Sequence, residues 1–255
     1  MTQNQRPRRN RASHLIRDLV AETIVDRRKL IMPHFVLEGK SLREPIASMP
    51  GISRVSVENL LKDIEADHKT GIDKILLFGI PEKKDEEGSG AYDRNGIVQK
   101  ALREIKKHFP GILVITDVCL CEYTSHGHCG MVDGGNILND PTLEILSRVA
   151  LSHAESGSDM VAPSDMMDGR IGAIRAALDG GGFDDLPILA YSAKYSSAFY
   201  GPFREAAGSA PQFGDRKAYQ MAPPNSDEAM REIGLDVEEG ADIIMVKPAL
   251  AYLDV

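Results

Sequence analysis

Short runs of apolar residues alternate along this chain with stretches in which apolar residues repeat at helical spacing. Six of the runs have the length of strands and are rich in Val, Ile and Leu; they cover residues 30–36, 74–80, 112–118, 160–163, 187–191 and 243–246. Because their apolar residues do not alternate with polar ones, we expect strands that are buried on both faces. Strands of this kind, separated by helices, indicate a parallel sheet built from β-α-β units.

The stretches between the strands carry signals for helix ends. Apolar residues at helical spacing begin at Val57, and Gly71 is the expected stop of that helix. A later helix is expected to have Asp140 as its N-cap and Pro141 at its first position. Ser226 is expected to cap another.

Polar side chains follow four of the expected strands at their carboxyl ends: Asp117, Asp165, Lys194 and Lys247. An open doubly wound sheet and a closed (β/α)8 TIM barrel both fit the alternation, and a barrel keeps its chemistry at these strand ends. Only six strands are counted, whereas a closed barrel needs eight. We therefore expect residues 14–255 to form six of the eight units, with the C-terminal strands missing from this chain.

The N-terminal residues 1–13 (MTQNQRPRRNRAS) contain four arginines and no apolar period, which predicts an arm in front of the barrel domain. A disordered tail and an arm that wraps a neighbouring subunit both fit. The net charge of −8, from 38 acidic and 30 basic residues, argues against nucleic-acid binding. No apolar run is long enough for a membrane span and the N-terminus lacks a signal peptide, so we expect no membrane partner and a cytoplasmic location.

The three cysteines of the chain, Cys119, Cys121 and Cys129, follow one expected strand within a polar loop. Thiolates are ligands suited to zinc, and three of them leave the fourth tetrahedral position for water or substrate, as in a catalytic site. A structural site completed by His126 or His128 is one alternative. Three free thiols are another.

Two lysines, Lys194 and Lys247, close successive apolar strands. Burial and a neighbouring like charge both disfavour the ammonium form, so we expect lowered pKa values for both amines. A neutral amine attacks a ketone and forms a Schiff base. The alternative for either lysine is an ion pair with a carboxylate.

Residues 196–220, here called the lid segment, are rich in Gly, Ala and Ser and have little apolar period. We expect a long connection without regular structure, of the kind that often closes an active site. Its two arginines, Arg204 and Arg216, are suited to binding a carboxylate. A solvated surface loop is the alternative.

Several motifs, in order along the chain, resemble those of the porphobilinogen synthase family, also known as delta-aminolevulinic acid dehydratases. Residues 116–130 (TDVCLCEYTSHGHCG) resemble the metal-binding loop of its zinc-type members. Residues 191–204 (YSAKYSSAFYGPFR) and 214–221 (GDRKAYQM) resemble the first active-site lysine and the lid, and residues 245–249 (MVKPA) resemble the second lysine strand. The strand at residues 160–170 (MVAPSDMMDGR) also matches.

The resemblance implies a lyase of tetrapyrrole (heme and chlorophyll) biosynthesis that joins two molecules of 5-aminolevulinate into porphobilinogen with loss of two waters. In this family a lysine matching Lys247 forms a Schiff base with the first substrate, and one matching Lys194 forms it with the second. Arg204, Arg216 and Gln220 are expected to bind the second substrate and its carboxylate. Asp117 is the expected proton carrier.

The resemblance also implies zinc on Cys119, Cys121 and Cys129, a (β/α)8 barrel with an N-terminal arm, and assembly as a homo-octamer. Glu232 matches a position where many bacterial relatives bind a regulatory magnesium, although a solvated glutamate is an equal alternative. Relatives continue past the second lysine with further strands, so the chain is expected to be a fragment. A class I aldolase and a zinc-stabilised binding module are the competing functions.

Overall fold

The computed structural model describes residues 5–255, and the first four residues of the predicted arm lie outside the described residues. Contacts divide the chain into one unit that ends at Leu30 and a second unit, Ile31–Val255. The first unit holds three short helices, η1 (Pro7–Arg11), α1 (His14–Leu19) and η2 (Arg27–Lys29), none of which buries a side chain. The arm of residues 1–13 and its role stay predictions.

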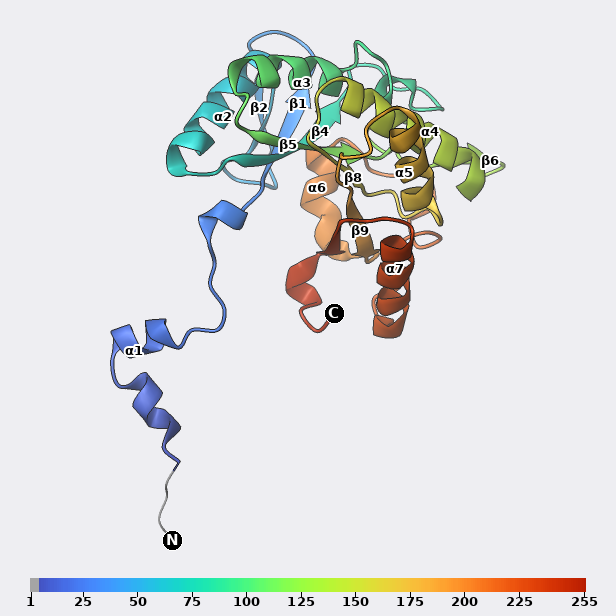
Figure 1. The fold of residues 1–255 in the computed structure, drawn as a ribbon. Coiled ribbons are helices and arrows are strands. Elements are labelled where there is room, and N and C mark those ends of the chain that lie inside the picture. Colours follow the sequence, from blue (N-terminus) through green and yellow to red (C-terminus); the bar gives the residue numbers. More distant parts are fainter. Residues whose placement is uncertain (1–4) are drawn as a thin grey trace. The chain divides into compact units, whose positions relative to one another are not determined.

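The second unit is built on parallel strands in chain order (Figure 1): β1 (Met32–Leu37), β4 (Lys74–Ile80), β5 (Leu113–Val118), β8 (Met160–Pro163), β9 (Leu189–Lys194) and β10 (Ile243–Lys247). Each is the parallel neighbour of the next, and a bridge between Val161 and Ile188 joins β8 to β9. The strand order does not reverse. In a doubly wound sheet it would reverse at one point. Within residues 5–255 the structure thus confirms six parallel strands in the order of a TIM-type barrel.

Four three-residue strands were not predicted from the sequence. The strands β2 (Arg43–Pro45) and β3 (Ser53–Val55) form an antiparallel pair, and β3 also pairs in parallel with β1. The strands β6 (Met131–Asp133) and β7 (Asn136–Leu138) form a separate hairpin. The β2–β3 pair therefore extends the sheet beyond β1.

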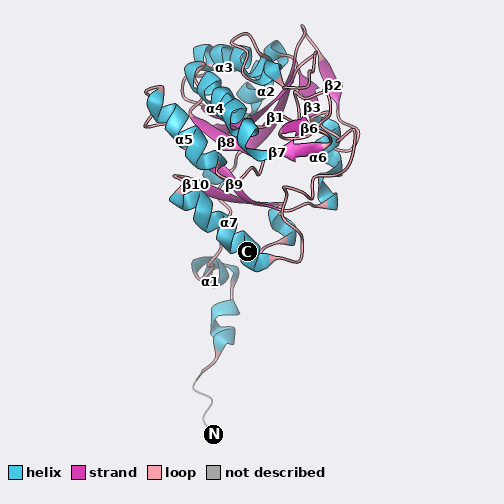
Figure 2. Ribbon diagram, turned by 90° about the vertical axis from the view of Figure 1, so that its right-hand side faces the viewer, coloured by secondary structure: helices cyan, strands magenta, loops and turns pink. Residues whose placement is uncertain are grey.

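Helices pack on the outer face of the strands (Figures 1 and 2): α2 (Val57–Thr70), α3 (Ile97–His108), α4 (Asn139–Glu155), α5 (Arg170–Gly180) and α7 (Ser226–Glu238). In β1, Val36 packs outward with Leu60 of α2. Its neighbour Phe35 points to the opposite, inner face, where it packs with Phe78 and Tyr191. Alternation along each strand therefore separates an outer core under the helices from an inner core at the centre of the unit.

The structure confirms one of the expected helix ends and corrects two. Gly71 caps α2 with φ of 88°, a conformation that glycine adopts without the steric cost of a Cβ atom. Asp140 is not the cap of α4, because the helix begins at Asn139. Asp140 lies in the first turn, where its negative charge interacts favourably with the helix dipole. Ser226 is the first residue of α7, which follows Asn225.

Among the helices of residues 5–255, none combines the length and the apolar character that a membrane crossing requires.

Candidate functional site

The two lysines lie opposite each other across a pair of adjacent strands. Lys194 ends β9 and Lys247 ends β10, and the register of this parallel pair places the two residues side by side. Asp117 lies in β5 and Asp165 lies two positions after the end of β8, at the same carboxyl edge of the strands. The expectation that these strand ends meet is therefore confirmed in the geometry.

A register shift in β9 turns Lys194 toward the inner face. Between Ala190 and Ala193 the strand holds one residue more than its partner β10, which is a β-bulge. Tyr191 faces the inner core, so strict alternation would turn a residue three positions later to the outside. The additional residue returns Lys194 to the inner face, where it lies opposite Lys247.

The amine of Lys194 is enclosed by protein. Its side chain is 4% exposed, its Nζ donates to the carbonyl oxygen of Ser164, and the ring centroid of Tyr191 lies 5.6 Å away. Burial alone would lower the pKa of Lys194, but the nearby thiolates, that of Cys129 first, raise it above its ordinary value. The expectation of a lowered pKa is wrong for Lys194, because the charge of the cysteines outweighs burial.

Lys247 lies in an aromatic enclosure. Its Nζ lies 4.4 Å from the ring centroid of Phe203, 4.9 Å from that of Tyr191, 5.8 Å from that of Tyr200 and 5.9 Å from that of Phe78. Burial, reinforced by the charge of Lys194, lowers the pKa of Lys247 to about 8. The expectation of a lowered pKa is therefore confirmed for Lys247, whose amine is partly neutral at neutral pH.

The alternative that the lysines form ion pairs finds no support in the structure. Among the ion pairs of the described residues, none includes Lys194 or Lys247. The nearby carboxyl of Asp117 is buried, and its Oδ1 has no hydrogen-bond partner in the described chain. Burial and the neighbouring Glu122 raise the pKa of Asp117 well above its usual range.

The three cysteines converge after β5. The Sγ atoms of Cys119, Cys121 and Cys129 all lie within 4.8 Å of one another, and all three side chains are buried. Three soft donors gathered in this way fit a thiophilic metal such as zinc. The chain thus contains a cluster that is able to bind a metal.

The histidines of the same loop are engaged elsewhere, which disfavours the alternative of a structural site completed by His126 or His128. His128 contacts the hydroxyl of Tyr219 through Nδ1 and the carbonyl oxygen of Phe213 through Nε2, at 3.1 and 3.0 Å. His126 contacts the carbonyl oxygen of Glu86 through Nε2 and accepts from the backbone N–H of His128 through Nδ1. Both imidazoles therefore connect the cysteine loop to other segments.

Glu122 is a residue of the site that the sequence analysis missed. It is buried, one of its carboxyl oxygens lies 3.3 Å from the Sγ of Cys121, and burial raises its pKa to about 8. It also forms a second potential metal-binding group with Asp117 and Cys119. The only signal in the sequence was its position next to Cys121 in a polar loop.

The lid segment is more ordered than predicted. It contains η4 (Ala198–Tyr200) and the helix α6 (Gly201–Ala206), so the expectation of a connection without regular structure is wrong. Apolar side chains of α6 pack on the inner core, and this packing stabilises a helix too short to persist alone. Arg216, farther along the segment, is buried and donates to the carbonyl oxygens of Gly127 and Ser209, which excludes a wholly solvated loop.

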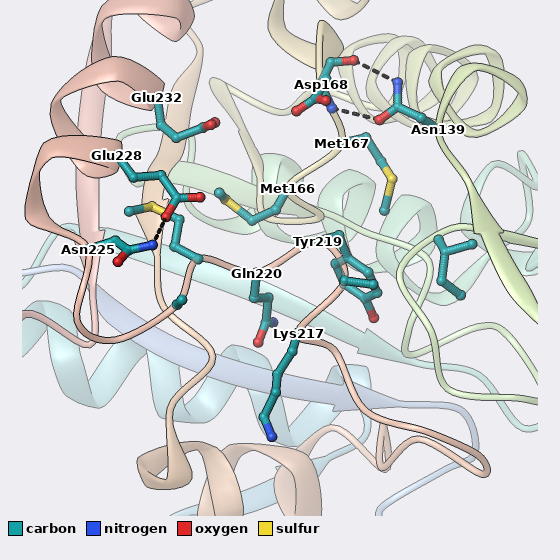
Figure 3. A pocket seen from close by; sticks show the side chains of 14 residues that line it. Asn139, Met166, Met167, Asp168, Lys217, Tyr219, Gln220, Asn225, Glu228 and Glu232 are labelled. Carbon is teal, nitrogen blue, oxygen red and sulfur yellow. Dashed lines mark hydrogen bonds between the residues drawn. The ribbon is translucent and has the colours of Figure 1, made fainter.

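A cavity of about 470 Å³ lies between the end of the lid segment and α7 (Figure 3). Gln220 lines it, is 3% exposed, and has no partner for either amide atom within the described chain. Glu232 lines the same cavity together with Asp168 and Glu228, and burial raises its pKa. Glu232 and Gln220 therefore line the same partly acidic cavity.

Fold and site together define a class of protein. The strand order is that of a TIM-type barrel, and the lysines, acids and thiols gather at the carboxyl ends of the strands, where barrel enzymes hold their catalytic groups. The chain is therefore a barrel-type α/β enzyme.

Comparison with known proteins narrows this class to one family. A family model described as delta-aminolevulinic acid dehydratase matches residues 4–255. The delta-aminolevulinic acid dehydratase of Methanothermus sociabilis is 58% identical, over 98% of this chain and 78% of that protein. The enzyme of the same name from Bacillus subtilis is 53% identical, over 98% of this chain and 77% of that protein.

A solved structure agrees with the sequence relatives. The delta-aminolevulinic acid dehydratase (porphobilinogen synthase) of Toxoplasma gondii, crystallised in complex with the reaction product porphobilinogen, superposes with a TM-score of 0.96 at 48% identity. The match covers 98% of this chain and 72% of that one. The chain belongs to the delta-aminolevulinic acid dehydratase family.

Proposed function

We propose that this chain is a porphobilinogen synthase, a lyase of tetrapyrrole biosynthesis that condenses two molecules of 5-aminolevulinate and releases two waters. The observation that carries the proposal is the pair of amines at Lys194 and Lys247, opposite each other on adjacent strands. Two amines side by side fit a reaction in which two ketones are activated together. The family relationship and the product bound to the Toxoplasma gondii enzyme support this choice over a class I aldolase.

The two lysines differ in protonation, and this difference suggests an order of reaction. Lys247, with a pKa of about 8, supplies a neutral amine that attacks the ketone of the first substrate, and the carbonyl oxygen leaves as water. Lys194 holds its proton more firmly, so it reacts after it has given up that proton; its neutral amine then forms an imine with the second substrate, whose carbonyl oxygen leaves as water. Buried Asp117, with its raised pKa, carries a proton between the reacting atoms.

Unpaired polar groups of the lid segment support carboxylate binding there. The Nε atoms of Arg204 and Arg216 have no hydrogen-bond partner within the described chain, and neither does the amide of Gln220. Buried polar atoms without a partner are costly, so a ligand that supplies the missing oxygens stabilises them. We therefore assign the carboxylate of the second substrate to these three side chains.

The cysteine cluster fits zinc, which Cys119, Cys121 and Cys129 would hold. When bound there, zinc supplies Lewis acidity to a substrate oxygen. In the acidic cavity, Glu232 with Asp168 and Glu228 offers oxygen ligands of the kind that magnesium prefers. We propose Glu232 as part of a regulatory magnesium site; the homo-octamer and the cytoplasmic location stay predictions.

A direct test is the formation of a pyrrole. The zinc-supplied protein is incubated with 5-aminolevulinate, and porphobilinogen is measured through its coloured adduct with an aldehyde reagent. We expect turnover by the unaltered protein and none by Lys247→Met. An aldolase would yield no pyrrole, and a zinc-stabilised binding module would leave the substrate unconsumed; either result would overturn the proposal.

A further inference from the structure

The C-terminal end of α6 is bound by cations from distant parts of the chain. The helix ends at Ala206, and the last carbonyl groups of a helix have no partner within the helix itself. This end matters for the site because α6 carries Phe203, whose ring centroid lies 4.4 Å from the Nζ of Lys247. It also carries Arg204, one of the proposed carboxylate ligands.

Arg54 donates to two of these carbonyl groups. Its Nε lies 2.7 Å from the carbonyl oxygen of Ala206, and its Nη2 donates to that of Glu205. A guanidinium presents its donors in a fixed planar fork, so two adjacent carbonyls orient it. Its charge also faces the negative end of the helix dipole.

Lys84 and a backbone contact complete the attachment. Lys84, from the loop after β4, donates through Nζ to the carbonyl oxygen of Gly208 at 2.6 Å. The carboxylate of Glu205 accepts from the backbone N–H of Ala47, in the loop between β2 and β3, at 3.2 Å. In Figure 2, α6 lies near the β2–β3 pair, as these contacts require.

Arg54 belongs to a strand of the sheet and is therefore held in a fixed position. Arg54 lies in β3 opposite Phe35 of β1, and the ring of Phe35 lies 6.0 Å from that of Phe203. The strand that holds the guanidinium and the strand that contacts Phe203 are therefore paired neighbours. A shift of the helix end would disturb the polar contacts and the aromatic contact together.

We propose that Arg54 and Lys84 are positioning residues, which hold the end of α6 so that Phe203 stays over Lys247 and Arg204 stays in place for the substrate carboxylate. The proposal rests on the proposed function. Neither cation contacts the reacting amine; both act through the placement of α6. Their loss should therefore weaken substrate binding more than it lowers the turnover rate of the enzyme–substrate complex.

The test compares Arg54→Met, Arg54→Lys and Lys84→Met with two controls, Arg103→Met and Lys83→Met, which remove exposed cations. Loss of hydrogen bonds from a charged donor corresponds to about a tenfold effect or more. We expect Arg54→Met to raise the KM for 5-aminolevulinate by about tenfold or more, with a smaller change in kcat. Arg54→Lys, which keeps a charge but not the fork, should fall between Arg54→Met and the unaltered protein.

Hydrogen exchange provides a readout that does not depend on turnover. The amides of residues 207–209 should exchange about tenfold faster or more in Arg54→Met, whereas those of α3 should not change. Arg54→Met with unaltered KM and unaltered exchange would overturn the proposal. A lower unfolding temperature in Arg54→Met, with no change in KM or in local exchange, would also overturn it, because Arg54 would then have a purely structural role. Failure of the unaltered protein to make porphobilinogen would instead contradict the proposed function, while the exchange result would still decide whether the cations hold α6.

Discussion

At the scale of single residues, the difference between the two lysines yields a pH prediction. Burial lowers the pKa of Lys247, the like charge of Lys194 lowers it further, and only the neutral amine reacts. Imine trapping by borohydride on Lys247 should therefore increase with pH and reach half its maximum near pH 8. In Lys194→Met the like charge is gone, so the midpoint should move to higher pH.

The measurement is a pH series of borohydride trapping followed by peptide mass analysis. Lys83→Met, which removes an exposed amine, is the matched control and should leave the midpoint in place. A midpoint that stays unchanged or moves to lower pH in Lys194→Met would contradict the assigned cause of the shift.

Arg204 and Arg216 should differ in the cost of their removal. Each contributes a charge-assisted contact to the substrate carboxylate, so each change to alanine should weaken substrate binding by about 1.5–3 kcal/mol. Arg216 also donates to the carbonyl oxygens of Gly127 and Ser209, which its removal leaves unpaired. Steady-state kinetics should therefore show the larger rise in KM for Arg216→Ala, and equal values in both variants and the unaltered protein would refute the assignment.

The residues of the site were foreseeable in part. The two lysines, three cysteines and Asp117 follow apolar strands, and the carboxyl ends of parallel strands meet at one edge. Glu122 and Arg54 carried no such signal. Burial by segments far along the chain gives Glu122 its raised pKa, and Arg54 contacts helix carbonyls about 150 positions away. The spacing of residue types along the sequence does not show which residues so far apart in the chain come into contact.

At the scale of elements, a buried ion pair connects α5 with α7. Arg170, 2% exposed, donates to both carboxyl oxygens of Asp236, at 3.1 and 3.0 Å, and lies 3.8 Å from Asp165. Arg170→Met would leave two buried carboxyl groups without their cation. We expect a loss of about 3–5 kcal/mol in the free energy of unfolding, because an unpaired buried charge is costly.

Urea unfolding of Arg170→Met measures this loss directly. Arg103→Met, an exposed arginine on the outer face of α3, is the control and should change the free energy of unfolding by less than about 0.5 kcal/mol. Equal stability of the two variants would show that the ion pair contributes nothing beyond a surface charge.

The elements themselves were predicted unevenly. The six long strands were found because each is a run of apolar residues buried on both faces. The four short strands escaped detection because three residues show no period. The bulge in β9 also carries no sequence signal: between Ala190 and Ala193 the residues are Tyr191 and Ser192, and nothing in their types shows that the register shifts there. The side to which Lys194 points could not be read from alternation.

At the scale of the whole molecule, the fold should be independent of the metal. The three thiols belong to the buried cluster that packs with α4 and α5, whereas the cluster under α2 and α3 and the inner core contain none of them. Exhaustive chelation should therefore abolish turnover and leave the unfolding temperature nearly unchanged, and zinc should restore the rate. Cys129→Ala should weaken metal binding, because one of three thiolates is lost. Full activity after chelation, or global unfolding by the chelator, would contradict this separation.

The central claim is that Lys194 and Lys247, on adjacent strands of one barrel, each bind one molecule of 5-aminolevulinate as an imine. The most direct measurement is to reduce the protein with borohydride in the presence of 5-aminolevulinate and to locate the added mass by peptide mapping. We predict labelling of Lys247, together with loss of porphobilinogen formation in step with the label, and no labelling of that position in Lys247→Met. Label on surface lysines alone, or normal turnover by Lys247→Met, would contradict the account.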